Sequence, residues 1–434
     1  MRDGPRHIGT RPATSAVRRA MRLASVNAGL WAVGNGLVST QLVIYLASEF
    51  GARGLGISLI LAAPRFAGLM RLGVPALIAR LQRRKAICIA AYLASSLMLC
   101  GLPLVALGER YLTARQTLII LIAAWCIYHL FEYVGTVAIW SWLGDLTPAR
   151  IRGRLLGERE RWLVLGRIGG IAASASLATV WTAMLPDAPA WQPLALSAAA
   201  GAMMMALATA PLMKMPGVQS APSAVPRLPW RTLGRVFNDV PYRRLLTFSC
   251  AFALASGITL AAQQRYPIRV LEIPYATLLV LSSLMWVGQS MIAPWAGRLT
   301  DRHGNRPVMI ISLLIASAGL LFFLAASRQQ PWFIAGAYIA WIAYAGLNVG
   351  FDNTKLKLAP ADNNAPYLAA YHAVSDLANG ATIIFGGLLY DRLAAGGSNA
   401  LGLYAQLFFW GWVARTSTVF LLVRIIEPGA RRDT

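Results

Sequence analysis

Apolar residues in this chain come in long runs that short polar segments separate. About twelve runs approach or exceed the length of roughly 20 residues that a helix needs to cross a bilayer. Each run should be a helix, because a helix satisfies its backbone hydrogen bonds internally where lipid offers no partner. The predicted helices span residues 25–46, 56–79, 86–107, 117–143, 160–184, 193–213, 245–264, 274–297, 307–327, 332–353, 366–390 and 400–424.

Positive charge marks alternate ends of the predicted helices. Most of the 40 Lys and Arg residues lie before the first run, in every second gap, or after the last run. The gaps at 80–85 and 298–306 are basic, whereas the gap at 186–192 carries neither Lys nor Arg. Basic loops stay on the cytoplasmic side of a membrane. Both termini are therefore predicted to be cytoplasmic, and the short loops favour a bacterial inner membrane.

The composition excludes several classes of protein. The chain of 434 residues is 57% hydrophobic and 13% charged, whereas soluble domains average about 25% charged residues. A net charge of +23 can indicate nucleic-acid binding. That interpretation is rejected, because the cations flank apolar runs and do not form one continuous stripe.

Motifs of soluble catalysis are missing from the sequence. Cys88, Cys100, Cys126 and Cys250 lie inside apolar runs without metal-ligand spacing, which is typical of small buried side chains. There is no phosphate-binding G-x-x-x-x-G-K-[ST] loop, zinc motif or nucleophile elbow. We therefore expect no enzymatic activity, no cofactor and no bound metal.

The runs divide into two sets of six. A polar segment rich in Pro and Ser, residues 214–244, has linker composition and separates bundles at 25–213 and 245–426. Residues 1–24 are predicted to be a basic cytoplasmic tail, and 427–434 a second tail. The fold class is accordingly an all-α polytopic membrane protein, with twelve transmembrane helices in two pseudo-symmetric six-helix bundles.

Several sequence features of the first set recur in the second set. Basic tight loops follow the second and the eighth run, and the segment at 145–148 has a counterpart at 357–360. Such internal repetition is typical of secondary transporters, whose halves are repeats of one unit. Within the linker, residues 229–238 are predicted to form a short amphipathic helix on the membrane surface.

The loop at 297–306 reads GRLTDRHGNR and resembles a signature of the major facilitator superfamily, G-x-x-x-D-R-x-G-x-R. The resemblance implies that family's fold over roughly residues 25–425. It also implies a gating role for the loop residues Gly297, Asp301, Arg302, Gly304 and Arg306. Gly304 is expected to permit the tight turn.

The resemblance extends to the exit of the fourth run, where it adds Asp145 and Arg152 as gating residues. In the family, the acidic residue of the signature loop neighbours helix five, which here begins near residue 158. The first copy of the signature departs from the pattern, because Ala79 occupies the acidic position. Asn364 is expected to cap helix eleven in its place. The two intracellular gates are therefore predicted to be unequal.

Ionisable side chains inside membrane helices are costly, so each is a functional candidate. Glu132 lies near the middle of the fourth run with His129 on its face, and Asp376 lies in the eleventh run with His372 on its face. A carboxyl group held away from water can exchange protons near neutral pH. These four residues are therefore candidates for proton coupling.

Structural pairing is the alternative for both carboxylates. Glu132 would then pair with Arg71 or Arg167, and Asp376 with Arg415. A further possibility is that arginines within the runs bind an anionic substrate, because guanidinium groups present a planar fork of donors. The candidates for this role are Arg65, Arg71 and Arg167.

Polar residues within other runs can hydrogen-bond a substrate or link helices to one another. The resemblance implies that helices one, four, seven and ten face the central cavity. With Asn379, which shares the face of Asp376, the remaining cavity candidates are Asn27, Trp31, Asn35, Gln263, Tyr344 and Asn348.

The sequence as a whole predicts a monomeric secondary active transporter for a small solute in a lipid bilayer, working by alternating access and with proton coupling as a hypothesis. A non-transporting receptor or assembly partner on the same fold is the alternative. No nucleic-acid partner is expected.

Overall fold

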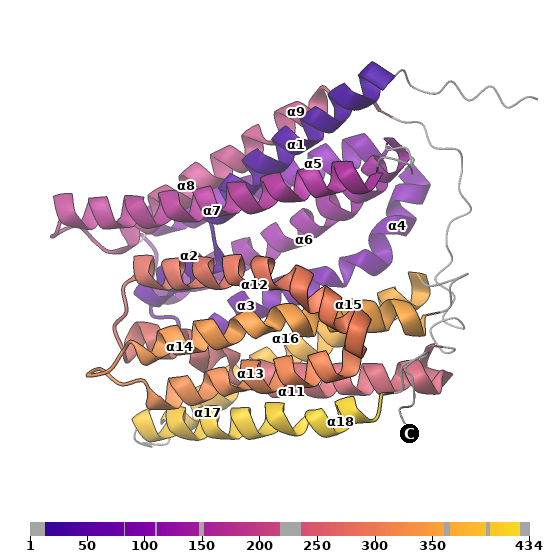
Figure 1. Ribbon diagram of the computed structural model, residues 1–434. Coiled ribbons are helices and arrows are strands. Elements are labelled where there is room, and N and C mark those ends of the chain that lie inside the picture. Colours follow the sequence, from indigo (N-terminus) through magenta and orange to yellow (C-terminus); the bar gives the residue numbers. More distant parts are fainter. Residues whose placement is uncertain are drawn as a thin grey trace, which may run out of the picture.

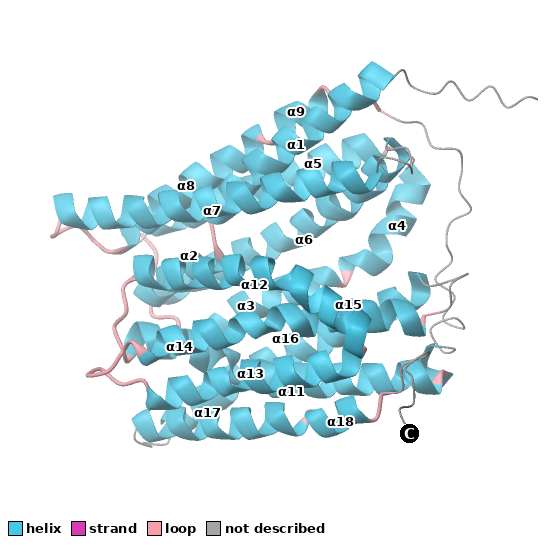
Figure 2. Cartoon of the chain, in the orientation of Figure 1, coloured by secondary structure: helices cyan, strands magenta, loops and turns pink. Residues whose placement is uncertain are grey.

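The structure is a computed structural model that describes residues 14–81, 83–108, 111–146, 152–217, 236–359, 365–395 and 400–425. Helices make up nearly all of these ranges, which contain no strand (Figure 2). Within them, eleven helices are long and apolar enough to cross a membrane, and one bent pair supplies a twelfth crossing. The predicted fold class is confirmed.

The first half contains six crossings, several of them built from two consecutive helices. Its helices are α1 (Thr14–Leu37), α2 (Thr40–Glu49), α3 (Gly54–Gly68), α4 (Met70–Leu81), α5 (Arg84–Leu107), α6 (Ala114–Leu146), α7 (Arg152–Met184), α8 (Trp191–Leu207) and α9 (Thr209–Met213).

The second half repeats this number of crossings. Its helices are α11 (Val240–Arg269), α12 (Tyr275–His303), α13 (Asn305–Ala325), α14 (Phe333–Ala340), the 3₁₀ turn η3 (Trp341–Ala343), α15 (Tyr344–Leu358), α16 (Ala365–Ala395), α17 (Ala400–Ser417) and α18 (Val419–Val423). The predicted surface helix at 229–238 lies mostly outside the described residues, as does the predicted cap Asn364.

The first helix begins at Thr14, inside the segment 1–24 that was predicted to be a basic cytoplasmic tail. A stripe of small and apolar side chains explains the earlier start: Ala20 is 1% exposed and Ala24 is fully buried. Arg18 and Arg19 point away from this stripe and are exposed. The helical periodicity of the apolar residues therefore continues into this segment, where the arginines between them lower the mean hydropathy.

Breaks in the crossings have local causes. Between α1 and α2, the Ser39 hydroxyl caps α2 by accepting from Leu42 N at 3.2 Å. Between α3 and α4 the chain bends by 47°. Pro64 and Pro75 lie inside these two helices, and proline removes a helical hydrogen bond. In the tenth crossing, η3 interrupts the helix at the level of Trp341.

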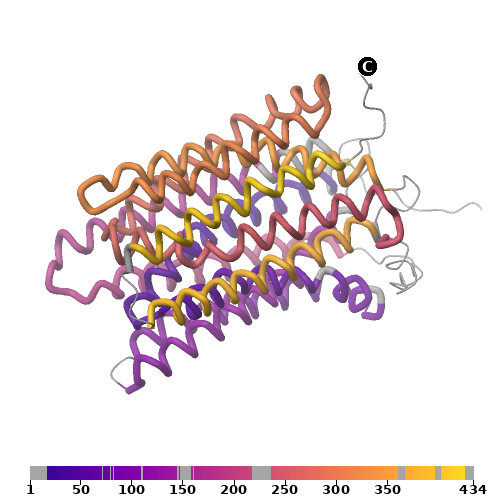
Figure 3. Tube along the Cα trace, turned by 90° about the horizontal axis from the view of Figure 1, so that it is seen from below, coloured from indigo at the N-terminus to yellow at the C-terminus, as the bar shows by residue number. Residues whose placement is uncertain are grey.

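The two halves are layered side by side (Figures 1 and 3). Within the first half, α1 packs against α7 and α5 against α6. Between the halves, α3 packs against α16 and α11, and α7 packs against α12. The buried apolar core is divided accordingly, with one large cluster in the first half and two clusters in the second.

Hydrogen bonds between the halves concentrate at one end of the bundle, where α3 begins and α16 ends. The Asp391 carboxylate accepts from the backbone N–H groups of Gly54 and Leu55, both at 2.8 Å. Tyr45 donates to the carbonyl of Ile273 at 2.6 Å. Arg265 and Arg269 donate to the carbonyls of Ala52 and Ser48. The charge pattern of the loops predicts that this is the outer end.

Candidate functional site

A cavity of about 730 Å³ lies within the second half and reaches α3 of the first half. It brings together seven residues that the sequence singled out. These are Arg65, Gln263, Tyr344, Asn348, His372, Asp376 and Asn379. Helices α11, α15 and α16 supply all of them except Arg65, which comes from α3.

One ion pair in the cavity joins the two halves. Arg65 Nη1 of α3 lies 3.5 Å from Asp376 Oδ1 of α16. The Arg65 side chain is 47% exposed and that of Asp376 only 15%. Gly68 makes room for the carboxylate, because a Cβ there would lie 2.8 Å from Asp376 Oδ2. The expected pairing of Asp376 with Arg415 is therefore wrong: its arginine partner comes from the opposite half.

Arg415 has a different environment. It is 2% exposed and donates to the Tyr344 hydroxyl at 3.3 Å, the Ser256 carbonyl at 3.3 Å and Thr259 Oγ1 at 3.2 Å. These bonds hold α17 against α11. Its Nε is buried and has no hydrogen-bond partner among the described residues.

A second ion pair lines the cavity toward the end of α15. Lys355 Nζ lies 2.7 Å from Asp352 Oδ1, one helical turn away, and 4.7 Å from the centre of the Tyr371 ring. Lys355 is 6% exposed, although it follows the end of the predicted helix at 332–353. The spacing of three residues between Asp352 and Lys355 could have predicted this ion pair.

Amides and aromatic rings make up much of the remaining lining. Gln263 donates to Thr259 Oγ1 at 2.7 Å, and Gln289 donates to the Trp341 carbonyl, beside the η3 interruption, at 3.0 Å. Asn379 Oδ1 is buried without a partner in the described ranges. Several lining residues were not predicted from the sequence, because their side chains are uncharged and do not stand out within apolar runs. These are Gln264, Gln289, Trp286, Phe252, Phe351 and Tyr371.

Three predicted residues of the first half, Asn35, His129 and Glu132, lie in a separate polar cluster. Glu132 Oε2 lies 2.9 Å from His129 Nδ1, so the described partner of Glu132 is His129 and not Arg167. His129 is 7% exposed and its Nε2 has no partner in that part. Asn35 donates to the Tyr128 hydroxyl at 3.3 Å, and the Tyr128 and His129 rings are 4.7 Å apart.

Three other candidates lie outside the main cavity. Asn27 is 1% exposed and donates to the Ala208 carbonyl at 2.7 Å, which links α1 to the α8–α9 junction. Trp31 packs on Tyr92 with ring centroids 4.2 Å apart. Arg167 lines a smaller cavity of about 410 Å³ between α7, α12 and α15.

The smaller cavity adjoins the main one, because four residues line both. These are Trp286, Gln289, Asn348 and Asp352. The side chain of Arg71 lies outside the described part, so its position relative to either cavity is not assigned.

A family model described as Major Facilitator Superfamily matches residues 266–428. The nucleoside transporter NupG is similar to the whole chain, with a TM-score of 0.66, 12% identity, and coverage of 95% of this chain and 99% of NupG. A D-xylose–proton symporter gives a TM-score of 0.68 at 13% identity, covering 96% of this chain and 99% of the symporter.

A bacterial homolog of the human lysosomal transporter Spinster, in an inward-facing conformation, gives a TM-score of 0.63 at 14% identity, with 95% of both chains covered. The search of curated protein sequences found no match. This chain has the major facilitator fold. The resemblance predicted from the signature loop is thereby confirmed.

The major facilitator signature loop joins α12 to α13. Gly304 has a φ of 83°, a left-handed conformation that glycine adopts without strain, as the motif requires. Gly297 lies in the last turns of α12, and Asp301 and Arg302 are exposed there. Within the described residues, Asp301 makes neither a hydrogen bond nor an ion pair, so its expected contact with helix five (α7) is not formed in this conformation.

The other gating residues surround this loop. Arg306 lies in the first turn of α13. Asp145 lies in the last turn of α6, and Arg152 is the first residue of α7. The side chains of both fall outside the described part. The gating role of the whole set stays a prediction.

Proposed function

We propose that this protein is a secondary active transporter that carries a small polar solute across the membrane by alternating access. The observation that carries the proposal is the main cavity, which lies within one six-helix half and takes an ion-paired arginine from the other. A cavity within one repeated half that is partly lined by the other half changes shape when the halves rock.

The proposed conformation is inward-facing. Hydrogen bonds of Asp391, Tyr45 and Arg265 close the interface at the predicted outer end. Rocking to the outward-facing state would break these contacts and form others around the signature loop. The proposed site of action is the bacterial inner membrane, with both termini in the cytoplasm and a monomer as the working unit.

The proposed substrate is neutral, with a ring and several hydroxyl or amide groups. Two of the cavity's cations, Arg65 and Lys355, are paired with carboxylates, so their charges are compensated internally. Amides and aromatic faces remain to bind a solute, the first through hydrogen bonds and the second through ring faces. The nucleoside and xylose named for two structural relatives are of this chemical kind.

Proton coupling through Asp376 is part of the proposal. Neutralising this carboxylate would release Arg65 and loosen the contact between α3 and α16, so protonation and rocking would be linked. Asp376 is favoured over Glu132 because Asp376 lines the cavity and joins the halves, whereas Glu132 and His129 pair within one helix. His372 lines the cavity one turn from Asp376 and would share in the proton exchange.

An anionic solute is the second candidate substrate. Arg415 favours it, because its buried Nε is an unsatisfied donor among the described residues and the residue lines the cavity. Arg167 in the adjoining cavity adds a second cation.

A stabilisation screen followed by uptake tests both candidates. Purified protein is heated with nucleosides, pentoses, hexoses and organic anions, and any solute that raises the Tm is then tested for uptake into proteoliposomes. Asn348→Ala removes a cavity amide and should weaken the response to that solute about tenfold, the effect of one lost hydrogen bond.

Asn238→Ala, which removes an exposed amide outside the cavity, is the matched control. The proposed function is wrong if no solute of either class shifts the Tm and no uptake is measured. A Tm shift without uptake would instead support the receptor alternative.

A further inference from the structure

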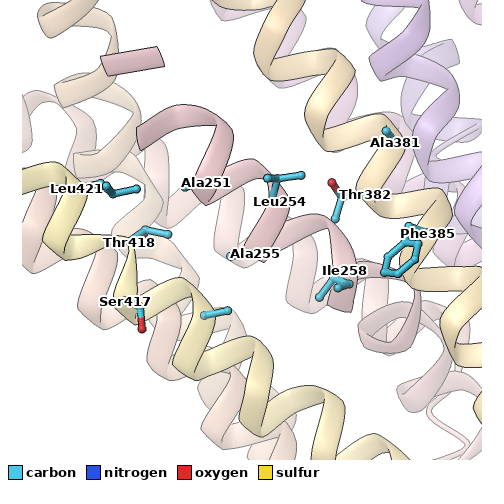
Figure 4. A pocket seen from close by; sticks show the side chains of 11 residues that line it. Ala251, Leu254, Ala255, Ile258, Ala381, Thr382, Phe385, Ser417, Thr418 and Leu421 are labelled. Carbon is cyan, nitrogen blue, oxygen red and sulfur yellow. The ribbon is translucent and has the colours of Figure 1, made fainter. Parts of the chain in front are cut away.

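The side of the second half that faces away from the first half carries an apolar groove between α11, α16 and α17–α18 (Figure 4). Its volume is about 720 Å³. Leu254 and Phe385 on its rim are 49% and 56% exposed, which is expected of side chains that face lipid. The lining residues are Ala251, Leu254, Ala255, Ile258, Ala381, Thr382, Phe385, Ala414, Ser417, Thr418 and Leu421.

The described residues that line the groove offer no free side-chain hydroxyl. The hydroxyls of Thr382, Ser417 and Thr418 each donate to a backbone carbonyl three or four residues earlier in the chain, at 2.6, 2.8 and 2.6 Å. Alanine side chains on all three walls leave the space that larger residues would fill. A hydrocarbon chain is therefore the ligand chemistry that the groove suits.

A basic cavity of about 610 Å³ adjoins one end of the groove. Arg243, Arg244 and Arg424 line it together with Thr247, and Leu421 lines both this cavity and the groove. Among the described residues, no acidic side chain lines this cavity. The Arg244 guanidinium donates to the Arg424 carbonyl at 3.2 Å, and within the described residues none of the three arginines forms an ion pair.

The two cavities have the spacing of a phospholipid. The fourteen residues from Arg244 to Ile258 along α11 rise about 21 Å at 1.5 Å per residue. Half of a bilayer's hydrocarbon core is about 15 Å thick, and the headgroup lies beyond it. The arginines therefore lie at headgroup level when the groove reaches the membrane midplane.

We propose that this surface binds one anionic phospholipid, with its phosphate on Arg243, Arg244 and Arg424 and an acyl chain in the groove. Guanidinium groups bind phosphate through parallel hydrogen bonds, and basic pockets between helices on the cytoplasmic side suit anionic headgroups. The adjoining apolar groove favours a lipid over a soluble phosphate. Arg415 keeps the groove preformed, because its bonds to Ser256 and Thr259 hold α17 against α11.

Native mass spectrometry of the delipidated protein tests this proposal, with dioleoyl phosphatidylglycerol as the titrant. The variant Arg243→Gln/Arg424→Gln should bind the first lipid about 30-fold more weakly, the effect of removing two cations near a headgroup. Arg80→Gln/Arg83→Gln removes two exposed cations elsewhere and should change nothing. Equal affinities of the two double variants would overturn the proposal.

A second pair of variants tests the groove with the arginines intact. Ala414→Phe fills the groove and should abolish tight binding of the first phosphatidylglycerol, whereas Ala405→Phe, on an exposed face of α17 outside the groove, should not. Dioleoyl phosphatidylcholine should bind at least tenfold more weakly, and glycerol 3-phosphate should not compete. Competition by glycerol 3-phosphate would show a site for soluble phosphate, and equal binding of the two lipids would show that charge is not used.

Discussion

At the scale of single residues, the Arg65–Asp376 pair lies where its formation or loss would affect the contact between the two halves. It joins the two halves at 3.5 Å, yet Arg65 is half exposed, so the pair contributes little to stability. A contact that contributes little to stability can still bias an equilibrium between two conformations of similar free energy.

Neutralising Asp376 should therefore uncouple transport without unfolding the protein. In proteoliposomes, Asp376→Asn should retain exchange of solute but lose accumulation driven by a pH gradient, by tenfold or more. The Tm should change little. The measurement is uptake with and without an imposed gradient, and full accumulation by this variant would show that Asp376 is not the proton site.

A charge swap separates pairing from proton transfer. Arg65→Asp/Asp376→Arg restores an ion pair between α3 and α16, so it should recover any Tm lost in the single variants. Accumulation should stay absent, because the carboxylate now belongs to another helix. Recovery of both properties by the swap would mean that the pair is structural.

The cavity residues could be predicted from the sequence only in part. Asp376 and His372 stood out because charged or polar side chains are rare inside membrane helices. Lys355 did not, because it resembled an ordinary loop cation. The predicted partner of Asp376 was wrong. Helical periodicity determines which residues share a face of one helix, whereas the packing between the halves determines which helix that face contacts.

At the scale of helices, α3 and α16 approach each other closely at the predicted outer end. A Cβ at Gly387 would lie 2.0 Å from Ser58 Oγ and 2.4 Å from the Gly54 carbonyl oxygen. The backbones of α3 and α16 could not approach each other this closely if Gly387 carried a side chain. The small residues therefore permit the closure that Asp391 completes with its two hydrogen bonds to α3.

Gly387→Leu should prevent this closure and hold the protein open to the outside. A cysteine introduced at Gln264 in the cavity, in a chain without its four native cysteines, should then react faster with an impermeant maleimide added outside. Uptake should fall below a tenth of the parent rate. Gly402→Leu is the control, because a Cβ there meets nothing within 4 Å. Unchanged labelling in Gly387→Leu would contradict the role of this contact.

The helices themselves were largely predictable, since bilayer thickness sets their length and loop charge sets their ends. Their breaks were not. The 47° bend between α3 and α4 and the η3 turn depend on how each helix packs around the cavity, which a hydropathy pattern does not record.

At the scale of the whole molecule, the repeat of the two halves is imperfect at the predicted cytoplasmic end. The second half has the complete signature loop with Asp301, whereas the first half has Ala79 at the equivalent position. The overall fold follows from the repeat, but the substrate does not, because side chains from non-adjacent helices build the cavity. This asymmetry also bears on how the molecule alternates.

In the conformation that we propose to be inward-facing, Asp301 is exposed and has no partner in the described part of the chain, so its replacement should leave this conformation intact. Its contribution belongs to the opposite state, in which the halves close at the cytoplasmic end and an acidic side chain can approach the N-terminus of α7, where the helix dipole favours an anion. Asp301→Asn should therefore reduce the maximal uptake rate about tenfold at unchanged Tm, and should make the Gln264 cysteine react more slowly from outside.

Ala79→Ser provides the comparison at the other gate. Because no acidic group is present there to lose, its uptake rate should stay within about twofold of the parent. The two variants are compared in one preparation by uptake and by maleimide labelling. Equal losses at Asp301 and Ala79 would mean that the two gates work alike despite their sequences. A loss confined to Asp301 would mean that the second repeat alone supplies the electrostatic contact that stabilises the outward-facing state.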